Sequence, residues 1–354
     1  MSAMPADRPF FTVVTPVYKG LDFLEGCVKS LLAQTFVDYE HLLVDDGSPD
    51  ASGKLCDALA LADGRIRVIH TFNGGVTSAR NFGIREARGR WLLFLDQDDR
   101  LSPYALEAIF AALAQAGSDL VTWKFHDVWA GMAPGPSGPH RRYARQEMGL
   151  FYRTDTMHYV WAKAFNTEFL HAQGLLFDES IQDGTDDLPF VNAYCHAWFT
   201  LYPKAGVWYL EQPLYYYETG NEASVSNRPQ PFLESHLTMF TDLIRDMDRV
   251  YGVPQAQQGP LYRRCLHTLA YGVLSTPKPR RRALRQTVLR RPEVAAILDR
   301  MKQNKVYSPF YLPYRLGSTG LVCFLFRSFE SDKWWYWKFY WLGYYLLGGN
   351  WQRD

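Results

Sequence analysis

Apolar and polar residues follow two different patterns along the first 125 positions. Short runs rich in β-branched residues stop at turn residues, as strands do. Between these runs, apolar residues recur at helical spacing, for example at Leu24, Val28 and Leu31. The pattern predicts strands at Phe10–Thr15, Glu40–Val44, Ile66–His70, Trp91–Leu95 and Asp119–Phe125, and helices at Leu24–Leu32, at Ser52–Ala62 and from Gly75 to about Ala87.

The helix after the fourth strand has a specific start signal. Ser102 is a typical N-cap residue, and Pro103 suits the first position of a helix. We therefore expect this helix to begin at Pro103 and to end at Gly117.

Strands that alternate with helices predict βαβ units and an α/β fold with a largely parallel sheet. Right-handed crossovers bring the C-terminal ends of the strands to one edge, where ligands bind. Two acidic strings directly follow strands, at Asp45–Asp46 and at Asp96–Asp99. We therefore expect both strings to lie at the same edge of the sheet.

The pattern changes after the fifth strand. Residues 131–140 are rich in Gly and Pro and mark a seam. From Leu233 onward the spacing is helical, and we predict three parts: 1–127, 128–229 and a helical extension over 230–354. One helix face is predicted to carry Leu233, Leu237, Phe240, Ile244, Met247 and Tyr251, and a second helix to carry Leu261, Cys265, Leu266, Leu269 and Val273.

Composition narrows the class of protein. Of the 354 residues 47% are hydrophobic, so the chain can bury a core, and its net charge of +1 argues against a nucleic-acid partner. The five cysteines include no Cys-x-x-Cys pair, which speaks against a zinc site or a disulfide framework and favours a reducing compartment. There is no apolar signal-peptide core and no run of about 18 apolar residues for a transmembrane helix. We expect a cytoplasmic protein.

The string Asp96–Asp99 is the sharpest chemical signal. At a strand end, residues two apart point to the same side, so Asp96 and Asp98 can converge on one ligand. Close carboxylates repel each other unless a cation lies between them, and a hard divalent ion that bridges to phosphates fits such oxygen ligands. The alternative interpretation is an acidic turn that caps the next helix.

Three further strings also allow both a structural and a functional interpretation. Asp45–Asp46 is either a turn before a helix or a carboxylate site for a base or a ribose. Gly74 and Gly75, followed by Arg80, form either a plain helix start or a close backbone approach to a diphosphate. The acidic run 183–190 is either a helix N-terminus or the source of a general base for an incoming hydroxyl.

Together these strings have a recognisable order and spacing. They resemble the family 2 glycosyltransferases of GT-A fold, with a Rossmann-like, mostly parallel sheet flanked by helices. The match covers residue 10 to about 125 and continues more weakly through Trp161–Lys163 and Asp186–Phe190 to Ser224. The strings that carry it are Thr15–Tyr18, Ser30–Thr35, Val44–Ser48, Asn73–Asn81 and Phe94–Asp99.

The resemblance implies a nucleotide-sugar donor, with a UDP-sugar as our expectation, and Mn²⁺ or Mg²⁺ as cofactor. The implied metal ligands are Asp98 and Asp96. The implied donor-binding residues are Pro16 and Tyr18 at the nucleobase, Asp45 and Asp46 at uracil or ribose, Gly75 and Arg80 at the diphosphate, and Asp96 at the ribose.

The resemblance also implies the reaction. Asp187 is the expected base, and Asp186 stands where relatives often carry Glu, so the choice between the two stays open. A single displacement at the anomeric carbon, with the metal neutralising the diphosphate, would invert the configuration of a transferred hexosyl or N-acetylhexosaminyl group. Glu218 replaces a frequent Arg before the segment in which Ser224 and Ser226 would contact the diphosphate. The expected acceptor is a hydroxyl of a glycan or a lipid-linked molecule in surface polysaccharide synthesis.

Two other functions share parts of this pattern. A phosphohydrolase would use Asp96 as nucleophile and Asp98 as acid/base, but its motif follows the first strand and continues with Thr, whereas here Arg100 and Leu101 follow the fourth strand. A binding module could keep the fold without catalysis, although the intact acidic strings argue against that.

The C-terminal extension combines basic and aromatic segments. Lys278–Arg291 contains seven Lys or Arg and no acid, and Trp334–Tyr345 contains nine aromatic residues in twelve. Segments at membrane surfaces combine these features, and an inner-leaflet surface would suit a lipid-linked acceptor. The alternative is that the aromatic segment packs on the protein core.

Overall fold

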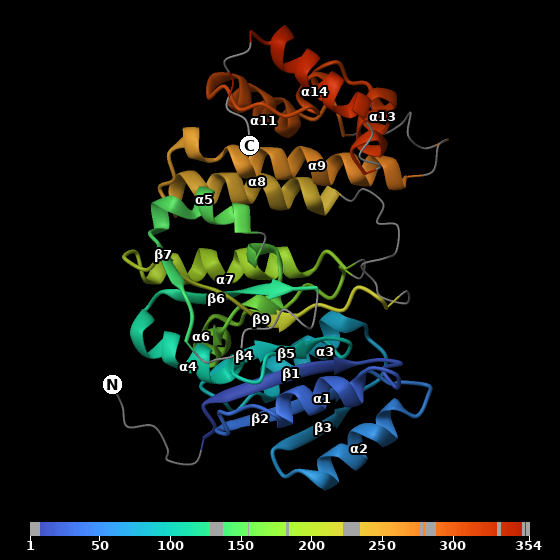
Figure 1. The fold of residues 1–354 in the computed structure, drawn as a ribbon, viewed down its shortest axis with the longest axis vertical. Coiled ribbons are helices and arrows are strands. Elements are labelled where there is room, and N and C mark those ends of the chain that lie inside the picture. The colour runs from blue at the N-terminus through green and yellow to red at the C-terminus, as the bar shows by residue number, and fades with distance from the viewer. Residues whose placement is uncertain are drawn as a thin grey trace. The chain divides into compact units, whose positions relative to one another are not determined.

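The structure is a computed structural model. The chain forms two compact units, one of residues 1–145 with 154–227 and one of residues 146–153 with 228–354 (Figure 1). The described residues are 8–127, 137–154, 156–181, 184–221, 234–276, 279, 288–330, 334–348 and 351.

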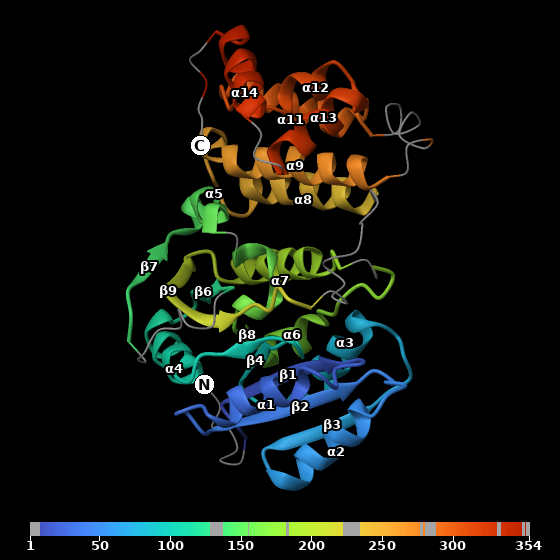
Figure 2. The ribbon, with the colours of Figure 1, turned by 45° about the vertical axis from the view of Figure 1, so that its right-hand side comes forward.

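The first unit contains a mostly parallel sheet, as the strand and helix pattern predicted (Figure 2). Its strands lie in the order β3-β2-β1-β4-β8, and only β8 is antiparallel to its neighbour. The wholly apolar β4 is an interior, buried strand, as expected. The strands are β1 (Phe11–Val17), β2 (Tyr39–Asp45), β3 (Ile66–His70), β4 (Trp91–Phe94) and β8 (Phe165–Asn166).

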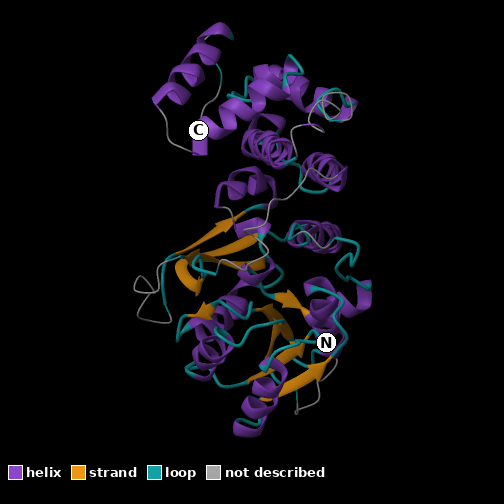
Figure 3. Cartoon of the chain, turned by 90° about the vertical axis from the view of Figure 1, so that its right-hand side faces the viewer, coloured by secondary structure: helices purple, strands orange, loops and turns teal. Residues whose placement is uncertain are grey.

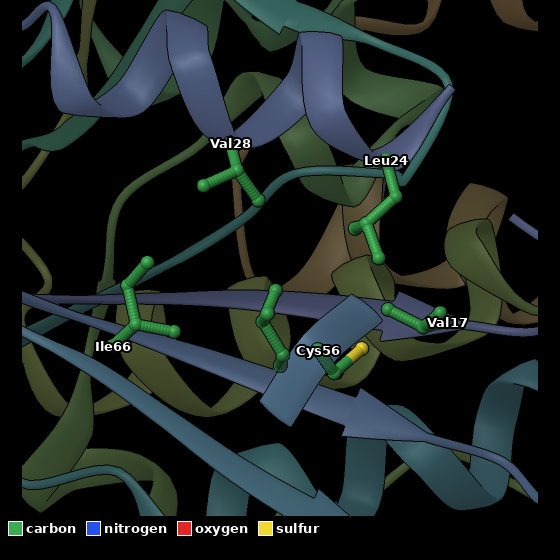
Figure 4. Packing of buried hydrophobic residues seen from close by; sticks show 6 residues of the cluster. Val17, Leu24, Val28, Cys56 and Ile66 are labelled. Atoms are coloured by element: carbon green, nitrogen blue, oxygen red, sulfur yellow. The ribbon is translucent and has the colours of Figure 1, made fainter. Parts of the chain in front are cut away.

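Helices cover both faces of this sheet. Val14 and Val17 are three residues apart on β1, so their side chains point to opposite faces. The helices α1 (Leu24–Leu32) and α2 (Ser52–Ala62) pack on the Val17 face around one apolar cluster (Figure 4). The helix α3 (Val76–Glu86) lies on the Val14 face, where a side chain at Gly83 would overlap Val14. The cluster consists of Val17, Leu24, Val28, Leu43, Cys56 and Ile66.

The predicted start of the fourth helix is wrong. The helix α4 (Ala105–Ala116) begins two residues after Pro103, and the Ser102 hydroxyl has no hydrogen-bond partner. The side chain of Gln34 replaces the expected cap: its Oε1 accepts a hydrogen bond from the Leu106 N–H at 3.0 Å, and its Nε2 donates to the Ser102 carbonyl at 2.7 Å. A long-range side chain therefore satisfies the free N–H of the first turn.

A second sheet in the first unit follows the order β5-β9-β6, with β7 paired to β9. The loop of residues 95–99 connects β4 of the first sheet to β5 of the second. The acidic string Asp96–Asp99 therefore lies where the chain passes between the two sheets. The remaining elements are β5 (Arg100–Leu101), β6 (Leu120–His126), β7 (His140–Tyr143), β9 (Val207–Tyr216), α6 (Thr167–Gln173) and α7 (Asp187–Leu201), with 3-10 turns at Thr156–His158 and Val160–Ala162.

The described elements of the second unit are helices (Figure 3). The apolar faces predicted for α8 (Glu234–Arg249) and α9 (Gly259–Ser275) are buried, while Leu233 lies outside the described residues. Tyr251, predicted for the first face, is buried but lies beyond the end of α8. In α14 (Trp334–Leu346), Tyr340 and Tyr344 pack edge-on against Tyr307. The other helices are α5 (Met148–Phe151), α11 (Pro292–Gln303), α12 (Tyr311–Arg315) and α13 (Thr319–Glu330).

Two findings concern the cysteines and the helix lengths. All five cysteines lie in described segments, are buried, and form no disulfide. Within the described part of the chain, no helix has both the length and the apolar character needed to cross a bilayer.

Candidate active site

The acidic string after β4 lies in a turn rather than on a strand. β4 ends at Phe94, and the Asp99 N–H donates a hydrogen bond to the Asp96 carbonyl at 3.1 Å. The strand alternation expected for Asp96 and Asp98 therefore does not apply, although the two carboxylates remain close enough to interact. Burial raises the pKa of Asp98, and the charge of Asp96 raises it further.

Asp99, the third carboxylate of the string, is fixed inside the protein. It accepts hydrogen bonds from the Tyr215 hydroxyl at 2.5 Å and from the Glu218 N–H at 2.8 Å. Burial raises its pKa well above the usual range, and Asp96 and Asp98 add to that rise. The Tyr215 hydroxyl also accepts a hydrogen bond from the Asp96 N–H at 3.2 Å, so a residue of β9 fixes the acidic loop. Sequence reasoning missed this role of Tyr215.

Arg80 connects the acidic string to the second acidic run. One guanidinium nitrogen donates to Asp186 at 2.9 Å and to Asp187 at 2.7 Å, and the other donates to Asp96 at 2.9 Å. Although burial alone would lower the pKa of Arg80, these carboxylates raise it. The structure thus brings together residues predicted for the donor, the metal and the base, which are up to 107 positions apart.

Asp186 and Asp187 differ in exposure. The Asp186 side chain is 3% exposed and the Asp187 side chain is 16% exposed. Asp187 also accepts a hydrogen bond from the Val160 N–H at 3.0 Å. Burial raises the pKa of both carboxyls, and Arg80 opposes that rise. Asp187 is therefore the more accessible of the two carboxylates.

The adjacent residues Asp45, which ends β2, and Asp46, which follows it, contact different parts of the chain. Asp45 contacts His70 Nδ1 at 2.9 Å, and His70 Nε2 contacts Asp57 at 2.9 Å. Asp46 accepts hydrogen bonds from the N–H groups that precede α3. Burial raises its pKa, and these N–H groups oppose the rise. Both carboxylates therefore bind other parts of the chain, and only Asp46 faces the start of the helix that carries Arg80.

The loop before α3 has the conformation that its glycines allow. Gly74 and Gly75 each donate an N–H to Asp46 at 2.8 Å. Gly75 is the N-cap of α3 with φ +88°, a value that favours glycine. Asn81 follows Arg80 and holds the Phe177 backbone through both its amide nitrogen and its amide oxygen.

Pro16 and Tyr18 occupy different environments. Pro16 is buried within β1 and pairs with Val44, whereas Tyr18 is 38% exposed just beyond the strand. The Tyr18 N–H donates to Gln97 Oε1 and the Gln97 amide donates back to the Tyr18 carbonyl, both at 2.9 Å. Gln97, which sequence reasoning did not single out, thereby ties the end of β1 to the acidic loop.

The residues expected to hold a metal fit a hard divalent ion in their chemistry. Asp98 and Asp96 supply carboxylate oxygens, and each raises the negative potential at the other, which a cation would relieve. Within the described residues, no group of three or more His, Cys, Asp or Glu has the geometry to hold an ion unaided. Other oxygen ligands, such as water or a diphosphate, would complete the coordination. Asp183, Ser224 and Ser226 lie outside the described residues.

Comparison with known proteins identifies the family of the chain. A family model described as glycosyl transferase family 2 matches residues 12–165. The uncharacterized glycosyltransferase EpsJ of Bacillus subtilis (strain 168) is 34% identical over 65% of this chain and 67% of EpsJ. The succinoglycan biosynthesis protein ExoO of Rhizobium meliloti (strain 1021) is 31% identical over 57% of this chain and 60% of ExoO, less than two thirds of its length.

The fold has a close counterpart among solved structures. The crystal structure of S. aureus TarS 1–349 in complex with UDP superposes with a TM-score of 0.64 over 92% of each chain, at 16% identity. Such identity supports likeness of fold alone. The likeness to EpsJ carries the family assignment, which excludes the phosphohydrolase alternative. The chain belongs to glycosyltransferase family 2 and has the GT-A fold.

Proposed function

We propose that this protein transfers a sugar from a UDP-sugar to a hydroxyl of a glycan or lipid-linked acceptor in polysaccharide synthesis, with inversion. The observation that carries the proposal is the contact of Arg80 with Asp96, Asp186 and Asp187. The UDP bound by TarS and the succinoglycan role in the name of ExoO support the donor and the pathway class. The transferred group is a hexosyl or N-acetylhexosaminyl residue.

Donor binding is assigned to residues 1–127 and acceptor binding to residues 128–229. Asp98 and Asp96 would hold Mn²⁺ or Mg²⁺, which when bound would neutralise charge on the leaving diphosphate. Arg80 is engaged with carboxylates, so its influence on the diphosphate is electrostatic. The expected donor-facing residues remain Pro16, Tyr18, Asp45, Asp46, Gly75, Arg80 and Asp96.

Asp187 is assigned as the general base. Each of its oxygens accepts one hydrogen bond, from Arg80 or from the Val160 N–H, and an ionised carboxylate oxygen has a further lone pair for a proton. Asp186 is less exposed and serves to hold Arg80. The base removes the proton of the acceptor hydroxyl as that oxygen attacks the anomeric carbon. Binding both substrates in line supplies much of the acceleration.

The test compares Asp98→Ala and Asp187→Asn with the wild-type protein, using a panel of UDP-sugars with and without Mn²⁺. Each variant should stay folded and lose at least about 100-fold in transfer rate, because each lacks a group acting in the transition state. Asp38→Ala is the matched control, since Asp38 is exposed at the opposite end of β2. Near-normal turnover by either site variant would refute that residue's assigned role.

A surface of α14 supports a peripheral location at the inner face of the cytoplasmic membrane. Trp341, Leu342, Tyr345 and Leu346 are exposed and share one side of the helix by their spacing. Lys338 lies one turn earlier and is exposed. An anionic lipid surface matches this combination of interfacial aromatics and basic charge. The run Lys278–Arg291 contains seven Lys or Arg, and most of it lies outside the described residues.

A further inference from the structure

The proposed base receives a backbone hydrogen bond from a short irregular segment. Val160 donates its N–H to Asp187 Oδ2 at 3.0 Å and is the first residue of the 3-10 turn Val160–Ala162. A hydrogen bond to a carboxylate both orients it and favours its ionised form. The position of the Val160 N–H therefore bears directly on the base.

Lys163 fixes the segment that presents this N–H. Its ammonium donates a hydrogen bond to the Tyr159 carbonyl at 2.7 Å and another to the Thr156 carbonyl. These two carbonyls precede Val160 by one and four residues. The far end of the segment is held by Thr122, whose hydroxyl donates to the Ala162 carbonyl at 2.6 Å.

A buried lysine at this place costs free energy that an apolar residue would not. Lys163 is fully buried, and burial lowers its pKa to about 7, although Cys195 and Asp187 oppose the shift. A lysine in such a place is explained by the donors it supplies. The carbonyls that it satisfies belong to the segment that contacts Asp187.

We propose that Lys163 is a positioning residue for Asp187, acting through the segment Thr156–Ala162 to keep the Val160 N–H on the carboxylate. This rests on the proposed function, in which Asp187 is the base. Lys163 itself need not touch either substrate.

The test is a double-mutant cycle with Lys163→Met and Val160→Pro. Met keeps the length of the side chain and removes its donors. Proline removes the N–H, although it also exchanges the buried Val160 side chain for a ring. Its fixed φ suits the first position of a helical turn after Tyr159, whose backbone is extended at φ −118° and ψ 133°. Each variant should lower kcat about tenfold or more and leave the donor KM within about twofold.

The cycle shows whether the two substitutions lower kcat through the same contact or through independent ones. If Lys163 acts through the Val160 N–H, the double variant should be no more than about twofold slower than the slower single variant. Multiplying effects, or a Lys163→Met variant with unchanged kcat, would overturn the proposal.

Amide hydrogen exchange gives a readout independent of activity. Protection of the Val160 amide should fall in Lys163→Met and stay unchanged in Tyr194→Phe, a matched control that removes a different buried hydrogen bond, the one from the Asn166 N–H. Unchanged protection in Lys163→Met would refute the link between the two residues.

Asp187→Asn in the same assay distinguishes failure of the proposed function from failure of the role of Lys163. An inactive Asp187→Asn beside an unaffected Lys163→Met leaves the proposed function standing and removes this assignment. A wild-type protein that transfers no sugar from any UDP-sugar in the panel would overturn the proposed function, and the role of Lys163 with it.

Discussion

Arg80 is outnumbered by the carboxylates around it. Its one positive charge meets three carboxylates, so the group carries a formal charge of −2 when all are ionised (+1 − 3). The ring centroids of Phe94 and Phe177 lie 5.9 and 5.5 Å from the guanidinium carbon, and the two rings keep water away from it. The surplus negative charge at the donor edge favours a divalent cation beside Asp96, which is the physical reason to expect metal dependence.

Replacing Arg80 with Lys should separate charge from geometry. A single ammonium keeps the positive charge but cannot present the planar fork that reaches Asp96 and Asp187 at once. We expect kcat to fall about 100-fold, while Arg80→Met also lowers the free energy of unfolding by about 3–5 kcal/mol, because buried carboxylates are left unpaired. Denaturant unfolding and initial rates measure both effects. Arg85→Lys, an exposed change on the same helix, should alter neither.

The titration of Asp187 should appear in the pH dependence of kcat. The base acts in its ionised form, and burial raises its pKa above that of an ordinary aspartate, near 3.9. Activity should therefore decline as the pH falls, with a midpoint above about pH 4, at saturating donor and metal. A profile that stays flat down to pH 4 in a folded protein would argue against Asp187 as the base.

At the scale of elements, His70 at the end of β3 joins the end of β2 to the middle of α2 through Asp45 and Asp57. The hydrogen bond to Asp45, followed in size by the one to Asp57, raises the pKa of His70 above the usual value near 6.5. Because the folded-state pKa is raised, the stabilisation is complete below about pH 6.5 and is lost as the pH rises through the folded-state value.

His70→Gln should therefore lower Tm more at pH 6 than at pH 9. Asp57→Asn, which removes one partner, should weaken the pH dependence without abolishing it. Thermal unfolding across this range measures both variants. An equal difference between wild type and His70→Gln at both pH values would show that the contact is not stabilised by charge.

Local patterns predicted the elements well, and tertiary contacts explain the differences. The helix over Ser52–Ala62 and the strand over Ile66–His70 have the predicted bounds because their apolar spacing and turn residues are local signals. The start of α4 depends on Gln34, some 70 positions away, which no local rule can anticipate. β2 continues to Asp45, one residue beyond its predicted end, and Asp45 and Asp46 bind different partners, His70 and the Gly74–Gly75 backbone.

The candidate site could be foreseen as a set of residues but not as a network. The strand pattern predicted that Asp45–Asp46 and Asp96–Asp99 share one edge, since parallel strands end there. The place of Asp187 in the same site came from the resemblance to family 2 glycosyltransferases. The direct contact of Arg80 with both acidic regions, and the support that Tyr215 and Gln97 give the acidic loop, depend on side chains meeting across two sheets. Spacing along the chain carries no record of such contacts.

At the scale of the whole molecule, the relation to EpsJ covers 65% of the chain. The cellular location of the protein is a separate question, and the helical second unit offers a test of it. The exposed side of α14 predicts binding to anionic vesicles. The double variant Trp341→Ser/Tyr345→Ser should lower the vesicle partition coefficient about tenfold, because two interfacial aromatic side chains are lost. Co-sedimentation of the full chain measures it, with the exposed Leu61→Ser as control. Binding should weaken at an ionic strength of about 500 mM, because salt screens the attraction between the basic residues and the anionic lipids. Equal binding by wild type and the double variant would place the membrane contact elsewhere or nowhere on this chain.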